Sequence, residues 1–128
     1  MRPYVTYADV LAICPYVDQL APGEDEFSGQ RLAARAWLDA AIRAATHLQH
    51  FTVHIDDRIR RVCAYKAASE ILASQITPMV EANAYGTMAA KFQRMAESEI
   101  STLIVCLADE ADTIQRVNLG VTKRGYHG

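Results

Sequence analysis

Apolar residues recur along most of this chain at three- and four-residue spacing, the period of an amphipathic helix. The first helical segment is short. Thr6 can cap a helix through YADVLAIC, and Pro15 ends it because proline has no backbone N–H to donate. Pro22, Gly23 and Gly29 then indicate a surface loop.

A long second helix is predicted for residues 29–49. Its apolar stripe is expected to contain Ala33, Trp37, Ala40, Ala41, Ala44 and Leu48. Arg35 and Asp39 are four residues apart and are expected on another face, as a pair that supports the helix. The many alanines would let a neighbouring helix approach closely.

The β-branched and aromatic residues of HFTVHI predict a break before a third helix. This helix, residues 57–75, would be capped by Asp56 or Asp57. The residues expected to face inward are Ile59, Val62, Cys63, Lys66 (its stem only), Ala67 and Ile71.

A last long helix is predicted for residues 87–112, with Thr87 as its N-cap. Its stripe would comprise Met88, Phe92, Met95, Glu99, Leu103 and Leu107. Residues from IQRVNLGV onward are expected either to pair as an edge strand or to stay mobile until bound.

The hydrophobic pattern of the whole chain therefore predicts an all-α fold: a small bundle of about four helices, one short and three long, over residues 1–115. An extended C-terminal arm, residues 116–128, would follow.

Composition suits one globular domain of 128 residues with a net charge of −2, so no global basic field would draw the chain onto nucleic acid. The three cysteines are far apart and are expected to be small buried apolar side chains. The N-terminus lacks a secretory pattern and no stretch approaches a membrane span, which predicts a soluble protein made inside the cell.

Catalytic chemistry has little support, and no catalytic residue, cofactor or metal is expected. His47, His50 and His54 form the one metal-like cluster, but the predicted helix break would disperse them. The acids near Glu97 and Glu110 are interpreted as solvated helix surface. A metal enzyme that uses the histidines remains an alternative.

Arg58, Arg60 and Arg61 cluster in the first turns of the third helix, where cations oppose the helix dipole. Guanidinium groups suit phosphate and carboxylate equally well. We expect these arginines at a subunit interface, opposite the acidic loop residues Glu24, Asp25 and Glu26 of a neighbour. The alternative is a small helical DNA-binding regulator that uses the Arg58–Arg61 helix.

The order of elements, with the opening YVTYADV and with RIRRVCAYKA and YGTMAAKF, resembles the head–tail connector (adaptor) proteins of tailed bacteriophages and phage-like particles. The resemblance covers nearly the whole chain. It implies a structural virion protein without enzymatic activity, located in the neck and assembled in the host cytoplasm. About twelve copies would form a ring between the portal protein and the tail or a stopper or terminator protein. Double-stranded DNA would pass through the ring non-specifically, and no membrane would be involved.

The resemblance also implies that the C-terminal segment reaches a neighbouring ring. The expected portal-docking arm comprises Asn118, Leu119, Gly120, Val121, Thr122, Lys123, Arg124, Gly125 and Tyr126. Within it, Val121 to Tyr126 would dock, with the two cations meeting acidic portal residues.

Overall fold

The computed structural model describes residues 1–76 and 82–120. The elements, in chain order, are helix α1 (Tyr7–Ile13), the 3-10 helix η1 (Pro15–Leu20), helix α2 (Ser28–Thr46), strand β1 (Thr52–Val53), helix α3 (Asp57–Ser74), helix α4 (Ala82–Ile100), strand β2 (Ile104–Ala108) and strand β3 (Ile114–Asn118).

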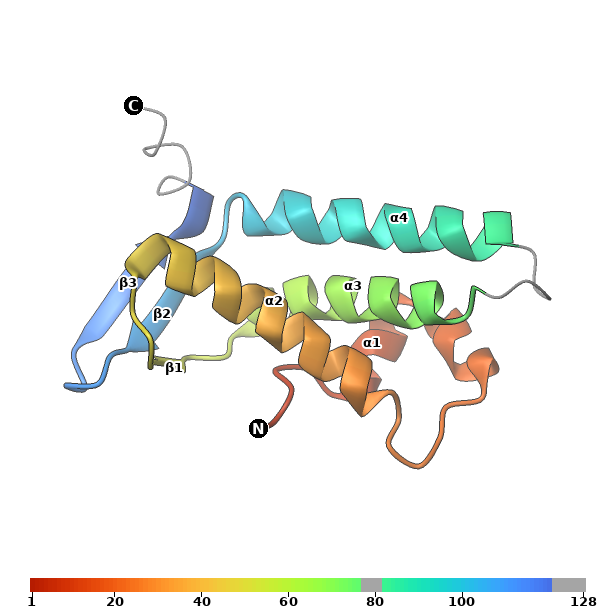
Figure 1. The fold of residues 1–128 in the computed structure, drawn as a ribbon, viewed down its shortest axis with the longest axis horizontal. Coiled ribbons are helices and arrows are strands. Elements are labelled where there is room, and N and C mark those ends of the chain that lie inside the picture. Colours follow the sequence, from red (N-terminus) through yellow and green to blue (C-terminus); the bar gives the residue numbers. More distant parts are fainter. Residues whose placement is uncertain (77–81, 121–128) are drawn as a thin grey trace.

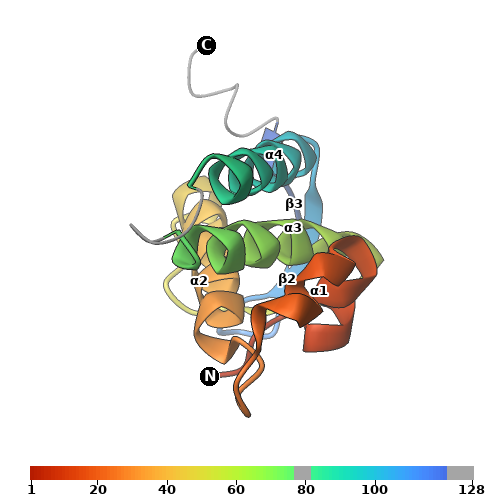
Figure 2. The same cartoon turned by 90° about the vertical axis from the view of Figure 1, so that its right-hand side faces the viewer.

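Helix α3 is the central element. Figure 2 shows α4 on one side of it and α1 and α2 on the other, and Figure 1 shows the strands gathered at one end of the long axis. Half of α3 is buried, including every residue expected to face inward except the half-buried Lys66. The strands form an antiparallel sheet in the order β1-β2-β3.

The all-α prediction is wrong, because the described residues include this three-stranded sheet beside the helices. The expected last helix to residue 112 ends at Ile100. Leu103 and Leu107 are four apart and fit a helix, but Leu103, Val105 and Leu107 also alternate, and it is this alternating set that is buried. A short apolar run fits both periods. Pairing with residues 114–118 decided between them.

Hydroxyl side chains explain where α4 stops. Ser101 Oγ donates to the Ser98 carbonyl at 2.6 Å and Thr102 Oγ1 to the Glu99 carbonyl at 3.3 Å, so they satisfy carbonyls of the last turn. The other end of α4 also differs from the prediction. The helix begins at Ala82, so Thr87 lies inside it and is not its cap.

The predictions for α1 and α3 are confirmed at their N-termini. Thr6 and Asp9 form a reciprocal capping box, and the Asp56 carboxylate accepts from the Ile59 N–H at 2.9 Å. Helix α1 ends before Pro15, as expected.

The predicted apolar stripe of α2 is wrong by about one position. Ala33, Ala40 and Ala44 are exposed, whereas the buried residues are Ala34, Leu38, Asp39 and Ile42. Turning Leu38 and Ile42 inward buries more apolar area than turning alanines inward. It also buries Asp39, which was expected on another face.

Asp39 is 4% exposed and has two side-chain partners. The Tyr4 hydroxyl donates to Oδ1 at 2.6 Å, and Arg35 Nε donates to Oδ2 at 3.3 Å. The Arg35 guanidinium also lies 4.4 Å from the centre of the Tyr4 ring and donates to the Arg2 carbonyl at 2.7 Å. These contacts hold the N-terminal segment against α2.

We expect Tyr4→Phe to lower the free energy of unfolding by about 1–3 kcal/mol, because a buried carboxylate loses a hydrogen-bond donor. Urea denaturation would measure this. Tyr7→Phe is the matched control, since the Tyr7 hydroxyl donates to the exposed Asp18 at 3.1 Å. Equal losses in the two variants would contradict the role given to Asp39.

Stability should also fall in alkali. Burial raises the pKa of Cys63 from 9.0 to about 12. Burial, followed by the hydrogen bond to Asp39, raises the pKa of Tyr4 above 10.0. The unfolded chain releases these protons first. The stabilising effect of the Cys63 proton is therefore complete below pH 9 and is lost between pH 9 and 12, and that of the Tyr4 proton begins to fall above pH 10.

The Cys63 thiol alone adds a slope of up to about 1.4 kcal/mol per pH unit in that window. Urea denaturation at a series of pH values should therefore give a flatter profile for Cys63→Ala than for wild type. Cys106→Ala, which removes a half-buried thiol, serves as the control. A profile for Cys63→Ala as steep as that of wild type would overturn the assignment.

Candidate interaction surfaces

The arginine cluster binds acceptors within its own chain. Arg58 donates to Thr102 Oγ1 at 3.0 Å and to the Thr102 carbonyl at 3.3 Å. Arg61 lies 3.0 Å from Glu99, which is also 3.5 Å from Arg58, and Arg60 pairs with Asp57 on the first turn of α3. Two of the three arginines thus attach the start of α3 to the end of α4, where cations are favoured. The favourable contacts with the end of α4 offset the unfavourable placement of these cations at the N-terminus of α3.

The acidic loop residues Glu24, Asp25 and Glu26 are exposed. Arg31 donates from Nη2 to the Asp25 carbonyl and from Nε to the Glu26 carbonyl, both at 3.0 Å. Their backbone is thus held, and the side chains of Glu24 and Glu26 extend from a defined loop. The loop precedes α2, toward the opposite end of the long axis from the start of α3 (Figure 1). Within one chain the structure does not bring the loop and the arginine cluster together.

The expected docking arm begins inside the folded body. Asn118 ends β3, and the Leu119 N–H donates to the Leu103 carbonyl at 2.9 Å. Leu119 is buried, and so is Gly120, which lies against the Ser101 backbone so closely that a Cβ would overlap the carbonyl oxygen. Val121 to Tyr126 lie outside the described residues.

The histidine cluster is spread along the chain between α2 and α3. His47 caps α2 with a left-handed backbone, φ 62°, and the His54 N–H donates to the Cys106 carbonyl at 2.8 Å. Within residues 1–76 and 82–120, no three His, Cys, Asp or Glu side chains gather as a group that could hold a metal ion. Cys14 and Cys63 are buried, as expected, but Cys106 is half-buried.

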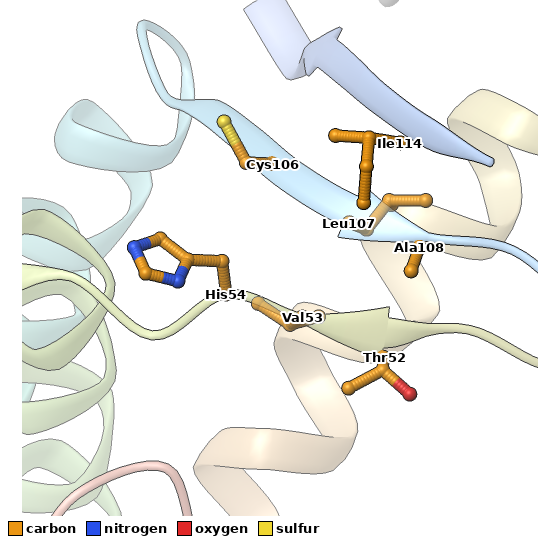
Figure 3. Close-up of a pocket in the computed structure, with 7 residues that line it drawn as sticks. All are labelled: Thr52, Val53, His54, Cys106, Leu107, Ala108 and Ile114. Atoms are coloured by element: carbon orange, nitrogen blue, oxygen red, sulfur yellow. The ribbon is translucent and has the colours of Figure 1, made fainter. Parts of the chain in front are cut away.

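The sheet carries an open hollow of about 430 Å³ on its outer face. It is lined by Thr52, Val53, His54, Cys106, Leu107, Ala108 and Ile114. Figure 3 shows that they come from all three strands. Sequence reasoning missed this hollow because residues 104–108 were assigned to a helix. The alternation of that segment was the available signal.

A second surface missed by the sequence analysis is the tyrosine patch, formed by Tyr16, Tyr85 and Ile76. The two hydroxyls are 3.0 Å apart and the ring centres 6.1 Å apart, linking η1 to the first turns of α4. Ile76 lies beside Gly86, the next residue of α4 after Tyr85, and is 40% exposed.

No helix among the described residues combines the length and the apolar character that crossing a membrane requires. No family model, no curated protein and no solved structure matches this chain.

Gly120→Ala should lower the free energy of unfolding by about 1–3 kcal/mol, because the added methyl group would force the Ser101 backbone aside. Thermal or urea unfolding would measure it. Gly29→Ala is the matched control: a Cβ there meets no atom within 4 Å, and alanine should favour the first turn of α2 by about 0.5–1 kcal/mol. A Gly120→Ala protein as stable as wild type would show that residue 120 is not packed against Ser101.

Proposed function

We propose that this chain is a structural neck protein of a tailed phage or phage-like particle, forming a ring between the portal and the tail through which double-stranded DNA passes. The proposal rests on the resemblance in its helical segments. The capped α1, the arginine-led α3 and the YGTMAAKF segment of α4 are elements that carry it. The β2–β3 hairpin adds to the helical body expected from that resemblance.

The structural observation that supports the docking-arm part of this proposal is the packed position of Gly120. Strand β3, the buried Leu119 and the close contact of Gly120 with Ser101 give residues 121–128 a defined starting point on the body. The sequence of this segment carries Lys123 and Arg124 and no acidic residue. A basic peptide that begins at a rigid point pays less entropy on binding than one on a loose tail, which suits a docking arm directed at acidic portal residues.

The DNA-regulator alternative has less support. A phosphate-binding helix needs guanidinium groups that face solvent without acidic competitors. Arg58 and Arg61 share Glu99, and Arg60 pairs with Asp57. Binding DNA through them would require breaking these intramolecular contacts.

Deleting residues 121–128 should abolish binding to the portal protein of the same particle while leaving the helices and sheet folded. The deletion starts after Gly120 because residues 118–120 belong to the folded body. Binding would be measured by pull-down or biolayer interferometry on purified portal rings. Circular dichroism would verify the fold.

The contribution of Lys123 and Arg124 to portal binding can be tested separately. Lys123→Glu with Arg124→Glu should weaken portal binding strongly, whereas Arg94→Glu, on the exposed face of α4, should not. Normal portal binding by the truncated chain would refute the docking arm. Tight binding of free duplex DNA, with a steep salt dependence, would favour the regulator.

A further inference from the structure

Exposed apolar side chains gather at the two ends of the molecule. Among the described residues, the large apolar side chains that are at least a third exposed are Met1, Tyr16, Ile76, Ile104 and Ile114. Apart from Met1, two of them lie in the sheet, where Ile114 lines the hollow and Ile104 lies at the far end of the β2–β3 ladder. The other two, Tyr16 and Ile76, belong to the tyrosine patch. Figure 1 shows the sheet at one end of the long axis and η1 with the facing ends of α3 and α4 at the other.

The sheet end presents a preformed hollow. Cys106 and Ala108 are small side chains on the outer face of β2, and Ile114, 72% exposed, stands beside them on β3 (Figure 3). The hairpin turn next to it is rigid, because Asp109 Oδ1 accepts from the backbone N–H groups of Ala111 and Thr113 at 2.9 and 3.0 Å. A fixed, mainly apolar hollow can receive a projecting side chain at little entropic cost.

The opposite end presents side chains of the complementary kind. The Tyr16 ring is held by Tyr85 and still reaches solvent, and Ile76 is exposed beside the same turns of α4. Tyrosine is enriched at the centres of protein interfaces because it buries a large area with few rotatable bonds.

Charged residues near the sheet hollow and near the tyrosine patch have opposite signs. Glu110 and Asp112, in the hairpin turn, are exposed and form no ion pair with another described residue. Lys91 is exposed on α4 and is likewise without an ion pair among the described residues. It lies near enough to Cys14, two residues before Tyr16, to lower the thiol pKa, although burial of that thiol raises it more. The two acids thus lie in the turn beside the hollow, and the cation lies on α4, the helix that contributes Tyr85 to the tyrosine patch.

We propose that the sheet hollow of one copy receives the tyrosine patch of a second copy, with Glu110 and Asp112 facing Lys91 across the contact. Two different surfaces meet, so the contact is heterologous, and repeating it closes a ring when the rotation between copies allows. The inference rests on the proposed ring and deepens it by naming the surfaces that join neighbouring subunits.

The test uses two variants of the full chain, each damaging one surface. Ile114→Asp places a charge at the edge of the hollow, and Tyr16→Asp places one on the patch. Each alone should remain monomeric in sedimentation velocity, with dissociation constants raised about tenfold or more. A one-to-one mixture should give dimers and nothing larger, because an intact patch and an intact hollow remain on different chains. Tyr16→Phe, which keeps the ring, and Ala40→Asp, on the exposed face of α2, should assemble like wild type.

Cys106 supplies a second readout. It lines the hollow, whereas Cys14 and Cys63 are buried. Its reaction with a thiol reagent should slow as wild-type protein is concentrated and stay fast in Ile114→Asp.

Three outcomes would each overturn the contact. The folded variants could assemble normally, the mixture could fail to dimerise, or the wild-type chain could stay monomeric with Cys106 reactive. A wild-type chain that assembles through this contact but does not bind portal would leave the contact standing and remove the neck function.

Discussion

The buried carboxylate of Asp39 is the interaction on which the arrangement of the N-terminal half depends. A charge this deep is tolerated only when hydrogen-bonded donors surround it, and here Tyr4 and Arg35 provide them. Turning Leu38 and Ile42 toward the core carries Asp39 inward with them, and the contacts from Tyr4 and Arg35 allow α2 to keep this rotation while alanines face solvent. It also places the first residues of the chain along α2, so that α1 starts where it can pack on α3.

The other end of the molecule is closed by polar contacts to the end of α4. Arg58 and Arg61 bring the start of α3 to Glu99 and Thr102, and the hairpin returns so that Leu119 bonds to Leu103. Three chain segments thus converge where α4 gives way to β2. In the proposed ring, a junction joined by these contacts would link the sheet to the helices that lead to the tyrosine patch. The same closure puts Gly120 at a defined place, from which the proposed docking arm would extend.

The distribution of surface chemistry fits an interaction protein better than a nucleic-acid reader. The arginines of the α3 cluster, Arg58, Arg60 and Arg61, are paired with carboxylates of the same chain. Among the described residues, exposed apolar side chains occur in the sheet hollow, with Ile114, and in the tyrosine patch, with Tyr16 and Ile76, two dissimilar surfaces toward opposite ends of the long axis. Dissimilar surfaces on one chain suit heterologous contacts between copies, whereas a symmetric dimer would use one self-complementary surface.

Local signals in the sequence determined the starts of α1 and α3 and the buried face of the central helix. Thr6 and Asp56 cap α1 and α3, Pro15 stops α1, and the apolar spacing of α3 identifies the residues it buries, because each depends on neighbours within a turn or two. Tertiary structure decided the rest. Residues 104–108 fit a helix and a strand equally well until residues 114–118 paired with them. The buried Asp39 of α2 takes its hydroxyl donor from Tyr4, which is thirty-five residues away in the sequence. The sheet hollow and the tyrosine patch join residues from distant segments, so no local pattern could reveal them: burial and pairing are properties of the assembled chain.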